Sequence, residues 1–134
     1  MTRKKARENA MNLVYEWIMG GEGGEETRFG LLEVSPGEPE ADYMERLYTG
    51  VVAHVGQIDE KLSSFLQGWS IERLSRVDLS ILRIAAYEML LGKEPTAVVV
   101  NEAVELANMY SSEKAGRFIN GVLGNLGRSL DDGK

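Results

Sequence analysis

The run from Ser75 to Leu91, SRVDLSILRIAAYEMLL, constrains the fold more than any other part of this chain. It contains no glycine or proline, and apolar residues occupy nearly every side of a helix drawn through it. A helix that is apolar almost all round is buried almost all round. Ser75 with Asp78 three residues later is typical of a helix start, and Gly92 is typical of a helix end. We therefore expect a central buried helix with the other helices packed around it.

Apolar residues recur at helical spacing through most of the remaining chain. The spacing predicts helices over residues 3–19, 41–55, 58–66, 96–109 and 112–126. Residues 20–40 are rich in glycine, proline and acidic side chains, with a short helix expected through Phe29, Leu31 and Leu32. The valines at 98–100 favour a strand by propensity, but the helical spacing of residues 100–107 outweighs them. The sequence shows no convincing strand pair, so the expected fold is all-α.

Three local features carry further expectations. Trp17 and Trp69 lie among apolar neighbours and are expected in the core. Thr96 or a neighbour is expected to cap the helix that follows Pro95. Gly121 in the middle of a helix costs about 1 kcal/mol relative to alanine, so we expect a close neighbour or a ligand to need its space.

The composition excludes several classes of protein. The 134 residues suffice for one domain with a core, and no apolar run approaches the ~20 residues of a membrane-spanning helix. The basic start, MTRKKAR, is not followed by the apolar segment of a secretory signal, and the absence of cysteine fits a cytoplasmic protein. Because the formal net charge is −6, a nucleic-acid site would have to be a local basic patch.

The sequence offers little catalytic chemistry. His54 is the single histidine, stands near the end of a predicted helix, and is expected to be a surface or capping residue. No nucleophile–base pairing, zinc-ligand spacing or phosphate-binding loop is found, and the carboxylates are spread over separate helices. We therefore expect a protein that is not an enzyme and has no metal site.

A basic cluster and one aromatic ring each have two interpretations. Arg3, Lys4, Lys5 and Arg7 oppose the dipole of the first helix, which indicates either an anionic ligand or a solvated basic end. Phe118 either packs in the core, which its neighbours favour, or is an exposed ring on which an RNA base stacks. In the second case the preceding residue, Arg117, would hold a phosphate.

Several motifs together resemble a known family. ILRIAAYE at 81–88 is followed by NEAVELA at 101–107 and FINGVL at 118–123, after a basic RKKAR at 3–7. This combination resembles the NusB family of bacterial transcription antitermination factors. The likeness covers nearly the whole chain and is weakest over residues 20–40. Each motif alone would be weak, whereas NEAVELA and FINGVL in this order are specific.

The resemblance implies an all-α fold of two small helical bundles packed together in one domain, residues 1–134. The N-terminal helical half would span about residues 1–67 and the C-terminal half about residues 68–130. It also implies an antitermination factor that binds single-stranded boxA RNA of ribosomal RNA operon leaders together with NusE, a small-subunit ribosomal protein. The pair would join the RNA polymerase antitermination complex, with neither catalysis nor a cofactor.

The family also implies functional residues. RNA-binding positions fall on Arg3, Lys4, Lys5, Arg7, Tyr15, Arg117 and Phe118. Core packing of Tyr15 stays open as an alternative. The surface that faces NusE falls on Glu72, Arg76 and Asp78. The sequence departs from many relatives at Asn108, Gly124 and Lys114, the last replacing an acidic residue seen in some of them.

Two other functions stay open. NusB-like domains also occur as RNA-targeting modules fused to ribosomal RNA methyltransferases, although 134 residues leave no room for a cofactor-binding α/β domain. Some relatives self-associate, so a homodimeric helical interaction protein is the other alternative.

Overall fold

The computed structural model describes residues 1–21, 27–28, 32–35 and 37–133. The elements are α1 (Arg3–Ile18), α2 (Ala41–Ser63), the short 3-10 helix η2 (Ile71–Arg73), α3 (Arg76–Leu91), α4 (Thr96–Tyr110) and α5 (Glu113–Asp132). No strand occurs in these ranges, which confirms the predicted all-α fold. Of the short helix predicted through Phe29, Leu31 and Leu32, the first two residues lie outside the described ranges, and Leu32 is not helical. No helix in the described ranges is long and apolar enough to cross a bilayer.

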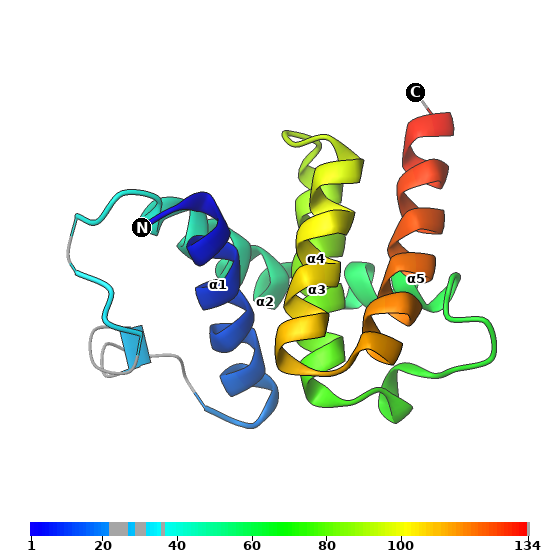
Figure 1. Ribbon diagram of the computed structural model, residues 1–134, viewed down its shortest axis with the longest axis horizontal. Coiled ribbons are helices and arrows are strands. Elements are labelled where there is room, and N and C mark those ends of the chain that lie inside the picture. The colour runs from blue at the N-terminus through cyan, green and yellow to red at the C-terminus, as the bar shows by residue number, and fades with distance from the viewer. Residues whose placement is uncertain (22–26, 29–31, 36, 134) are drawn as a thin grey trace.

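The central buried helix is confirmed as α3. It packs against all four other α-helices, with α1 on one side of the α3–α4 pair and α5 on the other (Figure 1). Ser75 caps its start, because the Ser75 hydroxyl accepts a hydrogen bond of 3.1 Å from the Asp78 N–H. Gly92 ends it in the left-handed conformation at φ 69°. Leu82 and Ala86 are fully buried in the middle, as the apolar run predicts.

One continuous core joins the helices on both sides of α3. α1 and α2 pack against each other, as do α4 and α5, and α3 contacts all of them. Buried apolar side chains of all five α-helices form a single cluster. The division into halves near residue 67 stays a prediction.

The two helices expected over 41–55 and 58–66 form one kinked helix, α2, that ends at Ser63. The backbone leaves the helical region at His54, with φ −121° and ψ 22°. No proline separates the two apolar stripes, so the helix bends and continues. The His54 ring is exposed, as expected, and stacks on Tyr87 with 6.0 Å between the ring centroids.

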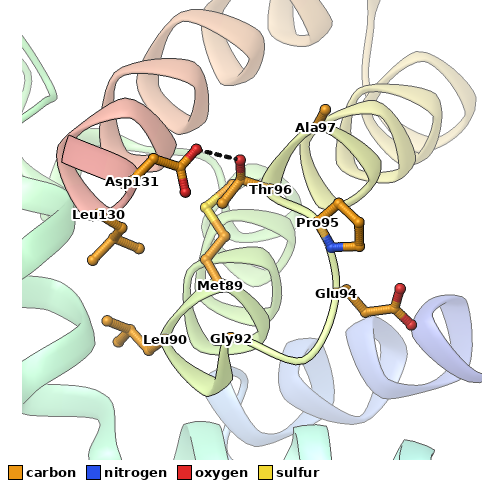
Figure 2. A pocket seen from close by; sticks show the side chains of 9 residues that line it. All are labelled: Met89, Leu90, Gly92, Glu94, Pro95, Thr96, Ala97, Leu130 and Asp131. Carbon is orange, nitrogen blue, oxygen red and sulfur yellow. Dashed lines mark hydrogen bonds between the residues drawn. The ribbon is translucent and has the colours of Figure 1, made fainter. Parts of the chain in front are cut away.

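The start of α4 and the end of α5 both differ from the prediction, and one hydrogen bond joins them. The expected cap of α4 is wrong: Pro95 precedes the helix, and no side-chain hydrogen bond caps it. The Thr96 hydroxyl instead donates a hydrogen bond of 3.0 Å to Asp131 of α5 (Figure 2). This link between the start of α4 and the end of α5 extends α5 to Asp132, beyond the predicted end at Leu126.

Of the remaining expectations, the core position of Trp69 is wrong, that of Trp17 is supported, and a ligand beside Gly121 stays a prediction. No side chain of the described residues approaches the Cβ position of Gly121, so crowding does not require glycine there. Trp69 is 55% exposed, because the chain leaves α2 through Gln67 and Gly68, which both have positive φ and turn Trp69 away from the core. Trp17 is partly buried against the core, as expected.

Candidate nucleic-acid interface

The first two turns of α1 carry four cations, and each of them pairs with a carboxylate. The ion pairs join Arg3 to Glu40 and Glu94, Lys4 to Glu102 and Glu105, Lys5 to Glu8, and Arg7 to Glu88. The side chains of Arg3, Lys4 and Lys5 are 41%, 54% and 53% exposed. Exposed ion pairs contribute at most ~1 kcal/mol, so an anionic ligand can compete with these carboxylates.

Arg7 differs from its neighbours because it is buried. Its Nε lies 2.9 Å from Oε1 of Glu88 and its Nη2 lies 2.8 Å from Oε2, a two-pronged contact between α1 and α3. The Arg7 residue is 6% exposed and Glu88 is 1% exposed. The hydroxyl of Tyr43 in α2 donates to the same carboxylate, and the Arg3 guanidinium lies 3.7 Å from the centre of the Tyr43 ring. In this arrangement Arg7 connects three helices and does not present its guanidinium to a ligand.

Raising the pH above about 10 is expected to destabilise the protein through Tyr43. Burial, and then the hydrogen bond to Glu88, raise the pKa of the Tyr43 hydroxyl above its ordinary value near 10. The unfolded chain therefore releases this proton at a lower pH than the folded protein does. The contribution to stability is fully present below about pH 10 and is lost progressively as the pH rises further.

Urea unfolding at about pH 8 and about pH 11 measures this decline in stability. The decline should be smaller in Tyr43→Phe, which has no hydroxyl to titrate. Equal declines in the two proteins would contradict the assignment to Tyr43.

A second cluster lies at the start of α5. The ring of Phe118 is partly buried and meets the exposed ring of Trp69 edge to face, with centroids 6.4 Å apart and planes at 64°. The two rings line a surface groove of about 310 Å³ together with Arg73, Lys114 and Asp78. Phe118 is thus neither a fully buried core residue nor a free ring.

The other predicted RNA-binding residues lie on different surfaces. Arg117 is exposed and lines a separate groove, beside Asn108 of α4, so it does not share the groove of Phe118. Tyr15 is 37% exposed, on the α1 face that also carries Lys4 and Glu8. Helix α4 lies between this face and α5 (Figure 1).

The residues expected to face NusE surround the start of α3. Glu72 and Arg76 are exposed, in η2 and at the first position of α3. Asp78 is half-buried, and its Oδ1 has no hydrogen-bond partner among the described residues. Because Asp78 and Phe118 line one groove, the structure places a predicted partner-facing residue beside a predicted RNA-facing ring.

The opposite end of the helices suits an anionic ligand poorly. A hollow there lies between the end of α3, the start of α4 and the end of α5 (Figure 2). Glu94 and Asp131 line it, and like charge disfavours a phosphate group at such a site. Within the described ranges, no cluster of histidine or acidic side chains could hold a metal ion.

The sequence pattern did not identify the roles of four residues: Trp69, Arg73 and Lys114, which line the groove beside Phe118, and Glu88, the buried partner of Arg7. Trp69 was assigned to the core, and Arg73 and Lys114 were not proposed as ligand-binding residues. Glu88 was considered only among dispersed carboxylates, because nothing in the local pattern pairs it with Arg7. Gly68 just before Trp69 was the one available signal that the chain turns there.

The comparisons with known proteins agree with one another. The NusB family model matches residues 4–128. The transcription antitermination protein NusB of Clostridium botulinum strain Hall is 42% identical, over 94% of this chain and 99% of its own. That of Listeria monocytogenes serotype 4a is 39% identical, over 94% and 96%.

Solved structures show the same fold. NusB of T. maritima has a TM-score of 0.81 at 29% identity, covering 96% of this chain and 92% of its own. A crystal structure of antitermination factors NusB and NusE in complex with dsRNA has a TM-score of 0.84 at 29% identity, covering 95% and 96%. Since the family model spans nearly all of the chain and the relatives match it over almost their full length, this protein belongs to the NusB family.

Proposed function

We propose that this protein is a cytoplasmic transcription antitermination factor that binds single-stranded boxA RNA together with NusE and acts by binding, not by catalysis. The observation that carries the proposal is the match to transcription antitermination proteins over 94% of the chain. A NusB of the same fold has been crystallised with NusE and dsRNA, which supports both partners. The relatives match over almost their whole length, which does not favour a module of a methyltransferase.

The RNA surface that we propose has two parts. Arg3, Lys4 and Lys5 bind phosphate groups by exchanging their carboxylate partners, which are only partly exposed, for the RNA backbone. Phe118 supplies a ring for base stacking, and Arg117 a cation on the neighbouring groove. Tyr15 extends the surface along α1.

Arg7 has a different part in this proposal. Its guanidinium is held by Glu88, so it positions α1 and the three exposed cations, and does not itself touch RNA. Glu72, Arg76 and Asp78 form the surface for NusE. The acidic net charge of −6 suits a basic ribosomal protein as partner.

Substituting Phe118 with alanine is expected to weaken boxA binding by about 1–3 kcal/mol, because a base loses its stacking platform. Electrophoretic mobility shifts with NusE present, repeated across a salt series, measure the loss. Leu90→Ala is the matched control, because Leu90 is also a partly exposed apolar residue but lies beside the acidic hollow at the other end.

Binding by the wild-type protein should also fall steeply with salt, since each phosphate contact releases counterions. Wild-type protein that fails to bind boxA RNA in the presence of NusE would contradict the proposed function. Equal losses in Phe118→Ala and Leu90→Ala would contradict only the role of the ring.

A further inference from the structure

The groove between Trp69 and Phe118 has the properties of a site for a single nucleotide. Trp69 stands 55% exposed at the surface and lines the groove together with the partly buried ring of Phe118. The loop that carries it runs alongside the start of α5, and the edge-to-face contact with Phe118 fixes the two rings relative to each other (Figure 1). A planar ligand can therefore meet two aromatic surfaces in one place.

The cations of this groove are unpaired, unlike those of α1. Arg73 and Lys114 are exposed, and no ion pair joins either of them to a carboxylate in the described part of the chain. They are available to an anionic ligand without displacing an internal partner. Among the described residues that line the groove, Asp78 is the one acidic residue, and its Oδ1 is buried away from solvent.

The charge of the groove lining indicates whether a protein side chain or an RNA phosphate binds there. Inside the groove, two cations against one half-buried carboxylate favour a phosphate over an arginine or lysine side chain, whereas Glu72 and Arg76 of the proposed NusE surface do not line it. The volume of about 310 Å³ lies at the small end of the range for ligand sites and suits one unpaired base better than a duplex. Unpaired bases stack on aromatic rings, whereas duplex RNA is recognised through its shape and backbone.

We infer that one nucleotide of a single-stranded RNA binds here, with its base stacked on one of the two rings and packed edge-on against the other, and with its phosphate held by Arg73 and Lys114. The inference rests on the proposed function and adds three residues to the RNA surface. It also places the strand at the start of α5, at the end of the helices opposite the acidic hollow.

The test compares the wild-type protein with Trp69→Ala, Lys114→Met and Arg46→Met. The probe is a labelled single-stranded boxA RNA, with the same sequence closed into a duplex as a second probe. Arg46→Met is the matched control, because it removes one exposed positive charge from α2, away from the groove. Thermal unfolding of each variant checks that the fold is intact.

Trp69→Ala is expected to weaken single-strand binding roughly 5- to 150-fold, the loss expected for one stacked base. Lys114→Met should lower the slope of log affinity against log salt by about 1, as one lost phosphate contact does. Arg46→Met should leave binding within about 2-fold of wild type, because exposed charges away from a site contribute little.

Tryptophan fluorescence provides a direct readout of stacking. In Trp17→Phe, Trp69 is the only tryptophan, and its emission should be quenched by the single strand and much less by the duplex.

The outcomes distinguish a failure of the inferred nucleotide site from a failure of the proposed function. Wild-type protein that binds no boxA RNA even in the presence of NusE overturns both. Wild-type binding that persists unchanged in Trp69→Ala and Lys114→Met, with no quenching of Trp69, overturns the groove alone. The groove is likewise overturned if the two variants keep RNA affinity but lose NusE in a pull-down, because it would then be a protein interface.

Discussion

Arg7→Met is expected to lower the free energy of unfolding by about 3–5 kcal/mol, the cost of removing one partner from a buried ion pair. Glu88 is 1% exposed, so its carboxylate would stay buried and, among the described residues, keep the Tyr43 hydroxyl as its one hydrogen-bond partner. Desolvation of an unpaired charge is what makes this loss large. Urea unfolding followed by circular dichroism measures it.

Two further variants test the cause of the loss. Lys5→Met removes an exposed cation two residues earlier on the same helix and should change the free energy of unfolding by no more than about 0.5 kcal/mol. The double variant Arg7→Met with Glu88→Met removes both buried charges and should recover most of the stability. A loss below about 1 kcal/mol in Arg7→Met, or no recovery in the double variant, would contradict the buried-pair account.

This result bears on the interpretation of RNA-binding data. A variant of Arg7 that binds RNA weakly would ordinarily be taken as evidence of a direct contact. If the weakening accompanies the loss of stability and is relieved in the double variant, the role of Arg7 is to position α1. A loss of affinity that persists in the folded double variant would instead show that the guanidinium itself touches RNA.

Gly50→Ala is expected to destabilise the protein by about 1–3 kcal/mol, although alanine is the better helix former. A Cβ at position 50 would lie 2.0 Å from Cζ of Tyr87, well inside contact distance. The Tyr87 ring would have to move, and the stacked His54 ring restricts it. Gly50 thus allows α2 to approach α3 closely.

Gly56→Ala on the same helix is the matched control. Among the described residues, no atom outside the local backbone lies within 4 Å of its Cβ position, so alanine should raise stability by about 0.5–1 kcal/mol. Thermal or urea unfolding of the two variants should therefore shift in opposite directions. Destabilisation by both to the same extent would show that helix α2 requires its glycines for a reason other than the Tyr87 contact.

The fold follows from local pattern to a large extent. The apolar run of α3, its serine cap and its glycine end are all visible in the sequence and all present in the structure. The observed ends of two helices differ from the predicted ones. The Thr96–Asp131 hydrogen bond lengthens α5. Helix α2 continues through its kink because the sequence near residue 54 contains no proline.

By itself, the sequence determined the helices, the all-α class and the family, because helical periodicity and short motifs depend only on residues close together in the chain. The tertiary structure decided which cations are available to a ligand. Arg7 meets Glu88, 81 positions later, and becomes buried, while Arg73 and Lys114 reach the surface beside an exposed Trp69 without an ion pair to any described residue. Exposure and ion pairing depend on which helix faces meet, and that arrangement arises only when distant segments pack together.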